Sequence, residues 1–278
     1  MIDQYAPYAK RADIEYLFRA LNAEQVIDIF LALLLEKKVL LISKYKALLT
    51  HASIALISFL FPLCWKHVLI PILPKNMTDV LDAPVPFLIG IDPQILKDDG
   101  SPFEIPNEVY RVDLDNGFIS LRDSKPKLPS KDYKLLKQRL LKATEGIERP
   151  SPSLDQVEQA FHVVQFDDEQ SRNQNDEDDE DDDVFRFNEY EIRDAFLEFM
   201  SSVMAGYTKC LNAPDSTKDV FFDSRDFFDF KKFRAAKDAT KNTSLLYKVT
   251  ETTLFANFIE ARSFGKSDQD EQIMFFDE

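Results

Sequence analysis

Residues 83–92 read APVPFLIGID, and this stretch decides the fold class. Proline fixes its own φ and keeps the residue before it extended, so Pro84 and Pro86 bring an extended chain to Phe87. The run from Phe87 to Ile91 is apolar without alternation, which is typical of a strand buried on both faces. We therefore predict a strand in a largely parallel sheet packed between helices, with Gly90 allowing close packing.

Helices and strands alternate in the region before this strand. Asn22 can cap a helix, with Gln25 three residues later, and apolar residues then recur at helical spacing. Val39 to Ile42 form a short apolar strand that closes at Ser43. The predicted order is a helix over 22–36, a strand over 39–42, an apolar helix over 47–61, a strand over 67–73 and a short helix over 75–81.

Pro71 and an Asn-Gly pair restrict the arrangement of the sheet. Because proline has no N–H for the ladder, Pro71 predicts an edge position, a bulge or a strand end. The segments 108–114 and 118–121 flank Asn116-Gly117, a pair that favours a two-residue type I′ hairpin turn. With a helix over 131–142, this order predicts an α/β domain with a mixed sheet.

The second half of the chain predicts helices and no convincing strand. A helical apolar face spans 190–211, and a helical pattern resumes over 244–262. We interpret the many phenylalanines of this half as core, because large rings fill the centre of a small helical domain. The predicted fold class is an α/β three-layer domain with a mostly parallel or mixed sheet, followed by a smaller all-α domain.

An acidic block separates the two halves. Residues 167–183 contain eleven acids and one arginine, a net charge of −10 within a total of −15 for the chain. Such a block repels itself and buries nothing, which favours a solvated linker over a specific site for a basic partner. Nucleic acid is disfavoured as a partner, because no concentrated basic face offsets this charge. The predicted division is an α/β domain over 1–146, an acidic disordered linker over 147–186, a helical domain over 187–264 and a flexible acidic tail over 265–278.

The sequence contains no recognisable catalytic constellation. Neither GxxxxGK[ST] nor GxGxxG occurs, so we expect no direct nucleotide binding. His51, His67 and His162 lack a nucleophile motif such as GxSxG, and we interpret them as structural or surface residues. Pairs such as Asp79 with Asp82 are expected by chance among 49 acids, so a hydrolase is left unsupported. We expect no cofactor and no metal.

The cysteine content and the apolar runs indicate the compartment. Cys64 and Cys210 are too few for a disulfide framework or a zinc cluster, which fits a reducing intracellular environment. The N-terminus lacks the apolar core of a signal peptide, and the longest apolar stretch, 54–65, is too short to span a bilayer. We expect a soluble, cytoplasmic protein.

Three segments carry a resemblance to a known family. They read LNAEQVIDIFLALLLEKKVLLIS, ALLTHASIALISFLFPLCWKHVLIPILP and MTDVLDAPVPFLIGI, and they resemble the central segment of DENN domains. Val85 stands where the family often has threonine. The helix at 192–211 and the sequence LFANFIEAR resemble the downstream DENN segment. The motif residues, for which we expect structural roles, are Pro62, Trp65, His67, Pro71, Pro74, Pro84, Pro86, Phe87 and Gly90.

The resemblance implies a binding function rather than covalent catalysis. Proteins of this family are guanine-nucleotide exchange factors for Rab GTPases, in which an upstream longin-like module and the central segment clasp the GTPase. It implies a Rab-type partner, a role in vesicle trafficking, and transient recruitment from the cytoplasm to vesicle or endosomal membranes, with membrane contact only through the GTPase. Because the chain begins almost directly in the central segment, we expect the upstream module to be absent, or supplied in cis or in trans.

Three loops form the expected GTPase-binding surface. In an open α/β sheet the loops after the carboxyl ends of the strands gather at one rim. The alternative for each loop is an ordinary exposed connection, and we interpret the stretch 84–90 as scaffold. The predicted contact residues are Ser43, Lys44, Tyr45 and Lys46, then Lys75, Asn76, Met77 and Thr78, and finally Asp92, Pro93 and Gln94.

Two functions from different classes remain open on the sequence. The first is an exchange factor, or part of one. The second is a non-catalytic adaptor or regulatory subunit that keeps the DENN scaffold, because losing half of the clasp would lower both affinity and exchange. A further hypothesis is that the acidic block controls access to the rim by charge, which high salt would abolish.

Overall fold

The structure is a computed structural model that describes residues 11–94, 105–120, 130–147, 187–212, 221–222 and 243–264. The predicted acidic linker beyond residue 147, His162 and the predicted tail lie outside these residues. The first described elements are α1 (Arg11–Ala20), α2 (Ala23–Leu34), β1 (Val39–Ile42), α3 (Lys46–Ser58), β2 (Val68–Ile70), the 3-10 helix η2 (Lys75–Asp82), β3 (Phe87–Ile91), β4 (Tyr110–Asp113) and β5 (Phe118–Ser120). They are followed by α4 (Ser130–Ala143), α6 (Glu189–Met204), η4 (Tyr207–Cys210), β6 (Leu211–Asn212), β7 (Phe221–Phe222), α8 (Thr243–Thr250) and α9 (Thr253–Phe264).

A five-stranded mixed sheet organises the first half of the described chain. Its strand order is β2-β3-β1-β4-β5, in which β2, β3, β1 and β4 are parallel and β5 is antiparallel to β4. All five residues of β3 are buried, as the apolar run from Phe87 to Ile91 predicts. The prediction of an α/β domain with a mixed sheet is confirmed, and β2 lies at the edge, as Pro71 indicates.

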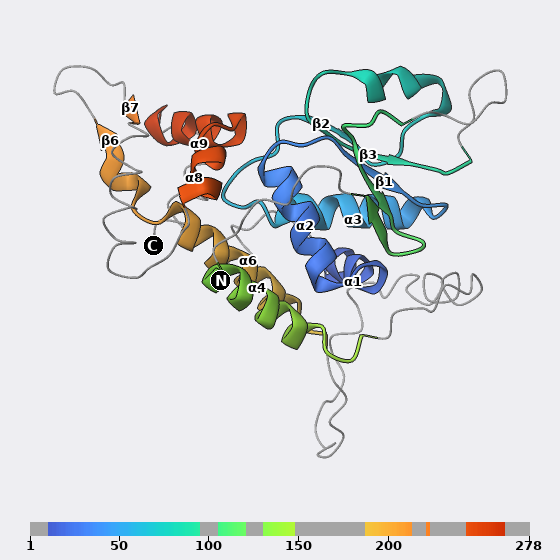
Figure 1. Cartoon of the computed structure of the whole chain (residues 1–278), viewed down its shortest axis with the longest axis horizontal. Coiled ribbons are helices and arrows are strands. Elements are labelled where there is room, and N and C mark those ends of the chain that lie inside the picture. Colours follow the sequence, from blue (N-terminus) through green and yellow to red (C-terminus); the bar gives the residue numbers. More distant parts are fainter. Residues whose placement is uncertain are drawn as a thin grey trace, which may run out of the picture.

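The two faces of this sheet are covered differently. Val39, Leu41 and Leu88 join α2 and α3 in one buried cluster. Leu40 and Ile89 face a second and smaller cluster, to which η2 and the segment 105–109 contribute. In Figure 1, η2 lies above the strands and α3 below them. Among the described residues, the second face is thus covered by a 3-10 helix and a loop, where the sequence analysis expects a helical layer.

The β4–β5 hairpin is present, but its turn differs from the prediction. The pairing of Asp113 with Phe118 leaves a four-residue loop. The Asp113 carboxylate accepts the N–H groups of Asp115 and Asn116 at 3.1 and 3.0 Å, which closes the loop from within. Gly117 has a φ of +60°, whereas Asn116 does not have a positive φ. A type I′ turn needs two such residues, so the predicted two-residue turn is wrong.

Four further features differ from the prediction. The helix predicted over 190–211 ends at Met204, and η4 and β6 follow it. The two-residue strands β6 and β7 pair antiparallel, although no strand is predicted after the acidic block. The helix predicted over 244–262 is divided into α8 and α9. Thr252 causes this division, because its Oγ1 accepts the N–H of Phe255 at 3.2 Å and so caps α9. The helix α1 is also absent from the sequence prediction.

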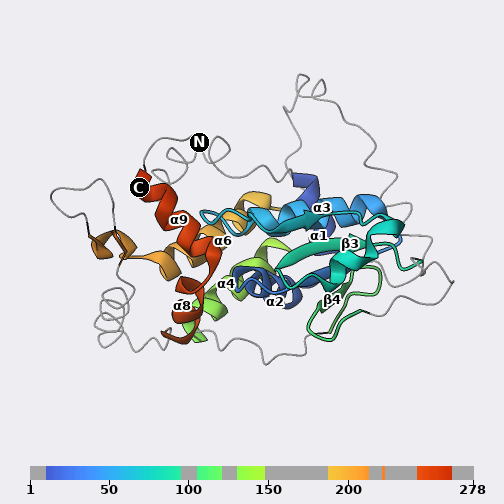
Figure 2. The same cartoon turned by 90° about the horizontal axis from the view of Figure 1, so that it is seen from above.

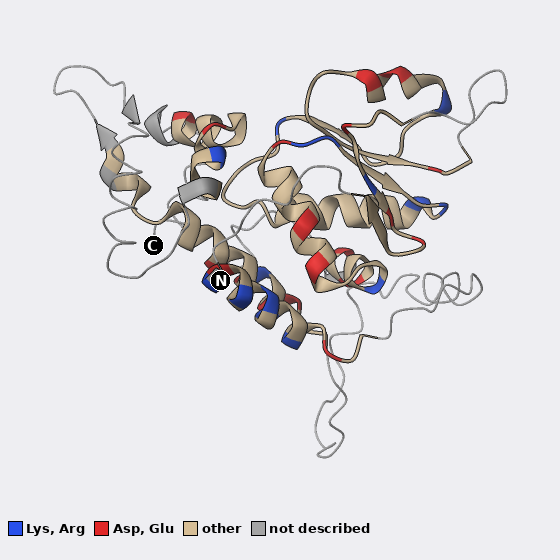
Figure 3. Cartoon of the chain, viewed as in Figure 1, with Lys and Arg blue, Asp and Glu red and all other residues tan. Residues whose placement is uncertain are grey.

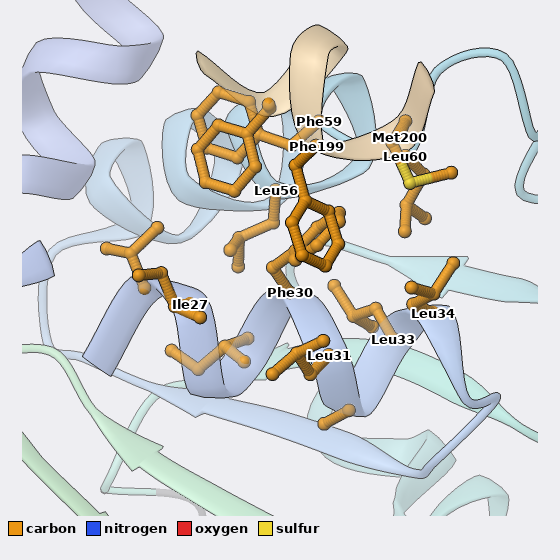
Figure 4. Packing of buried hydrophobic residues seen from close by; sticks show 14 of the residues in the cluster. Ile27, Phe30, Leu31, Leu33, Leu34, Leu56, Phe59, Leu60, Phe199 and Met200 are labelled. Atoms are coloured by element: carbon orange, nitrogen blue, oxygen red, sulfur yellow. The ribbon is translucent and has the colours of Figure 1, made fainter. Parts of the chain in front are cut away.

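Helix α6 packs its apolar face against the helices below the sheet. The ring of Phe196 stacks on Phe59 with centroids 4.1 Å apart, and it meets Phe30 edge-on at 4.9 Å. Phe199 meets Phe30 at 5.7 Å, and Figure 4 shows Phe199 and Met200 lying against the side chains of α2 and α3. One buried cluster therefore continues from α2 and α3 into α6, α8 and α9. Figure 2 shows α8 and α9 beside the sheet rather than over either of its faces.

A charged contact joins α4 to α6 along the edge of this core. Arg139 donates to Glu191 at 2.8 Å and to Asp194 at 2.5 Å, and it also pairs with Glu198. The three acids lie on one face of α6, so they can all reach one guanidinium group. The hydrogen bond to Glu191, followed by that to Asp194, raises the pKa of Arg139 above its ordinary value. Figure 3 shows basic positions along α4. Arg139 is the one that pairs with the three acids of α6.

Candidate functional site

The carboxyl ends of the parallel strands form one rim of the sheet. Ile42 at the end of β1 is in register with Ile91 of β3 and with Asp113 of β4. The ladder continues one step farther, because Ser43 N–H donates to Ile91 at 3.1 Å and Leu114 N–H donates to Ile42 at 2.9 Å. The loops after these strands therefore begin side by side, at the end of the sheet away from α8 and α9 (Figure 1).

The loop after β1 is held from inside the protein. Ser43 Oγ donates to Asp115 Oδ1 at 2.6 Å, and Lys44 N–H donates to Asp115 Oδ2 at 3.0 Å. The Ser43 hydroxyl also accepts the N–H of Tyr45 at 3.0 Å. Because Ser43 is fully buried, its side chain holds the loop and offers no surface to a partner. Asp115 is a residue that the sequence analysis does not single out.

The outer part of this loop carries two cations and one aromatic ring. Lys44 Nζ lies 5.1 Å from the centroid of the Tyr45 ring, a distance at which the cation and the ring attract each other. Lys44 and Tyr45 are half-buried, whereas Lys46 is exposed at the start of α3. This surface can bind a partner that presents carboxylates beside an apolar patch.

The other two predicted loops reach the same end of the sheet. Asp92 follows β3 directly, and its carboxylate accepts the N–H of Gln94 at 2.9 Å, while Pro93 and Gln94 are exposed. Leu73 N–H donates to Gly90 at 2.8 Å, close to the end of β3, which brings the start of η2 to this rim. Lys75, Asn76 and Met77 are exposed there, and Thr78 is half-buried. GTPase contact by these loops stays a prediction.

The Trp65 and His67 motif lies at the opposite end of the sheet. Trp65 is 9% exposed and donates its ring N–H to the Val68 carbonyl at 3.3 Å, and the His67 ring stands edge-on to it at 5.1 Å. His67 Nε2 lies 2.9 Å from Glu36 Oε1, and the same oxygen accepts the N–H of Leu254 at 2.7 Å. One carboxylate therefore joins α2, the β2 entrance and the first turn of α9.

Glu36 adopts a backbone conformation in which glycine is usual. Its φ is +53°, at the position just after α2 where helices commonly end in a left-handed residue. The N–H groups of Glu36 and Lys37 donate to Leu33 and Ala32, both at 2.9 Å, which completes a Schellman motif. Glycine would fit this conformation without strain, so glutamate needs a compensating contribution here. The contacts of its carboxylate with His67 and Leu254 provide that contribution.

Replacing Glu36 by alanine is expected to lower the free energy of unfolding by about 2 kcal/mol, because two hydrogen bonds to a charged acceptor are lost. Glu36→Gly also loses the carboxylate but relieves the left-handed strain, so we expect it to be about 1 kcal/mol more stable than Glu36→Ala. Urea unfolding measures both values. Asp79→Ala, at an exposed carboxylate of η2, is the control and is expected to leave the transition midpoint unchanged. Equal midpoints for Glu36→Ala and the parent chain would show that the hydrogen bonds of Glu36 to His67 and Leu254 do not stabilise the fold.

The proline and glycine motif residues lie in and around the described sheet, and their structural roles stay a prediction. A Cβ built on Gly90 would lie 2.0 Å from the carbonyl oxygen of Pro71, just after β2, and 3.2 Å from Leu49 Cβ of α3, so only glycine fits here. Pro74 precedes the first turn of η2, and Pro62 follows a cis peptide bond from Phe61. Pro84 is exposed, Pro86 is half-buried and Phe87 is fully buried.

The remaining polar residues of the described ranges form pairs rather than metal-binding groups. His51 Nδ1 lies 2.6 Å from Asp13 Oδ1, which ties α3 to α1. Within the described ranges, no group of three or more His, Cys, Asp or Glu side chains could hold a metal ion. Cys64 is exposed and Cys210 is buried, and both are free thiols. No helix in the described part of the chain is long and apolar enough to cross a membrane.

The comparisons with known proteins point to one family. Residues 2–117 match the family model described as the DENN (AEX-3) domain, a range that contains β1 to β4 and all three loops. DENN domain-containing protein 2B of Homo sapiens is 34% identical over 147 residues, which are 52% of this chain and 13% of that protein. The chain thus spans a small part of the length of this relative. Over residues 2–117, the chain is thus similar to DENN domains.

Proposed function

We propose that this chain is a guanine-nucleotide exchange factor, or part of one, for a Rab-type small GTPase. The observation that carries the proposal is the DENN family match over the residues that build the rim. The register of β1, β3 and β4 supports it, because the loops 43–46 and 92–94 begin side by side. On this proposal the chain acts from the cytoplasm in vesicle transport, and a longin-like module in cis or in trans completes the clasp.

The proposed mechanism is binding without covalent chemistry. An exchange factor that prefers the nucleotide-free GTPase weakens nucleotide binding by the factor by which nucleotide weakens its own binding. A rim with fixed loops suits this role, because little conformational entropy is lost when the partner binds. The basic loop 43–46 would face acidic side chains of the GTPase, which favours fast association.

The test is release of fluorescent GDP from a panel of purified Rab proteins. The chain at micromolar concentration is expected to accelerate release from at least one Rab. Lys44→Glu with Lys46→Glu is expected to reduce this acceleration about tenfold, which corresponds to about 1.4 kcal/mol of binding free energy. Lys66→Glu is the matched control, because Lys66 is exposed at the opposite end of the sheet.

The outcomes separate exchange from binding alone. Binding to a Rab without acceleration would overturn exchange activity and identify the chain as an adaptor that uses the same rim. Equal losses in the rim variant and in Lys66→Glu would show that the rim is not the contact surface. If neither binding nor release is seen, the test is repeated with a longin-containing partner present, and failure there would refute the proposal.

A further inference from the structure

One carboxylate on the rim holds two successive residues of a different loop. Both oxygens of Asp115 accept hydrogen bonds from the loop after β1, Oδ1 from the Ser43 hydroxyl and Oδ2 from the Lys44 amide. The Ser43 hydroxyl, in turn, accepts the Tyr45 amide. The amides of Lys44 and Tyr45 are therefore fixed, one directly and one through Ser43, by a residue from the β4–β5 loop.

The start of α3 has no side-chain cap of its own, and these contacts hold the backbone that leads into it. Tyr45 is the N-cap residue of α3, and its side chain makes no capping hydrogen bond. The backbone at the start of a helix needs acceptors for its free N–H groups. Here Ser43 and Asp115 supply acceptors for the two amides just before the helix, so the entry to α3 depends on a contact between segments far apart in the chain.

Asp115 is itself held in place by its own loop. The Asp113 carboxylate accepts the N–H of Asp115 at 3.1 Å and two donors of Asn116, the backbone N–H at 3.0 Å and Nδ2 at 2.8 Å. Asp115 is half-buried, and Ser43 is fully buried. Hydrogen bonds to a charged group away from bulk water are stronger than exposed ones. The contact therefore restrains the basic loop from a second loop that is itself restrained.

We propose that Asp115 is a positioning residue for the GTPase contact, acting through Ser43 on the loop that carries Lys44, Tyr45 and Lys46. This inference rests on the proposed function. It gives Asp115 an indirect part in binding, because Asp115 acts through the loop and not through its own contact with the GTPase. Its consequence is preorganisation: without Asp115 the loop is ordered only when the partner binds, which weakens binding. The maximal rate of GDP release at saturation stays close to that of the parent chain.

The test is a double-mutant cycle of Ser43→Ala and Asp115→Asn, measured in two ways. Amide hydrogen exchange at Lys44 and Tyr45 is expected to rise about tenfold in each single variant, and the double variant is expected to exchange no faster than Asp115→Asn. The Ser43 amide, bonded to Ile91 in the sheet, is expected to keep its protection and reports that the fold is intact. Ser43→Thr keeps the hydroxyl and is expected to restore protection at Tyr45.

The second measurement is GDP release as a function of chain concentration. Asp115→Asn and Ser43→Ala are each expected to raise the half-saturating concentration about tenfold with an unchanged maximal rate. Asp82→Asn is the matched control, because Asp82 is an exposed carboxylate of η2 outside the three predicted contact loops. A lower maximal rate with unchanged half-saturation would overturn the positioning role.

The two measurements separate this inference from the proposed function. If no Rab responds to the parent chain, with or without a longin-containing partner, the proposed function fails, while hydrogen exchange still shows whether Asp115 fixes the loop. Unchanged exchange at Lys44 and Tyr45 in both single variants would overturn the inference even if GDP release is active. Additive effects in the double variant would also overturn it, because independent residues do not act through each other.

Discussion

Replacement of Phe196 by alanine is expected to lower the free energy of unfolding by about 4 kcal/mol, the largest effect that we expect from a core residue. Phe196 is 1% exposed, and its ring contacts both Phe59 and Phe30. Its removal leaves a cavity at the centre of the contact among α2, α3 and α6, and aromatic pairs add to the loss of apolar burial. Urea unfolding of the chain measures this value.

The fluorescence of Trp65 makes the Phe196 experiment informative about cooperativity. Trp65 is the one tryptophan of the chain and lies beside His67 at the sheet, remote in sequence from α6. If α6 and the sheet unfold as one unit, Phe196→Ala shifts the urea midpoint by the same amount whether unfolding is followed by Trp65 fluorescence or by circular dichroism. An unmoved Trp65 transition would show that the helical part unfolds as a separate domain. Phe118→Ala, at a ring that is 62% exposed, is the control, with an expected change below about 1 kcal/mol.

Replacement of Gly90 by alanine is expected to lower the free energy of unfolding by about 3 kcal/mol, the upper part of the range for overpacked sites. The added Cβ would meet the Pro71 carbonyl oxygen at 2.0 Å, and a backbone atom cannot rotate away as a side chain can. The chain after β2 must therefore move away from β3. Thermal or urea unfolding of the variant measures the loss.

Gly117→Ala is the matched control for Gly90→Ala. Gly117 has a φ of +60°, and its added Cβ would lie 3.3 Å from the Ala20 carbonyl oxygen. We expect this substitution to cost about 1 kcal/mol, because left-handed strain dominates and the contact needs only a small shift. If Gly90→Ala is no worse than this control, the close approach of Pro71 does not fix the edge of the sheet.

Local signals account for the parts of the fold that the sequence predicts well. The Asn22–Gln25 capping box forms both of its hydrogen bonds, at 2.9 and 3.0 Å. The sequence predicts it well because its two residues are only three positions apart. The strands 39–42 and 87–91 can be predicted from their apolar runs and from the residues that bound these runs. The hairpin turn is predicted wrongly for a related reason: the Asn-Gly preference is local, but the Asp113 side chain offers a competing acceptor.

The contacts that build the site are not visible in a linear sequence. Ser43 and Asp115 meet only because β1 and β4 are neighbours, and the strand order must be known before either can be paired. Glu36 and Leu254 are farther apart still, and no periodicity relates them. The resemblance points to His67 but not to its partner carboxylate. The two-residue strands β6 and β7 are too short for any alternating pattern.

The edge position of β2 has a consequence for the behaviour of the protein in concentrated solution. An open sheet edge can recruit a strand from another molecule and so seed aggregation. Here β2 is three residues long, and Pro71 follows it at once, so the edge offers few N–H groups before a residue that has none. Among the described residues, the short strand and its proline thus leave little backbone with which another strand could pair at this edge.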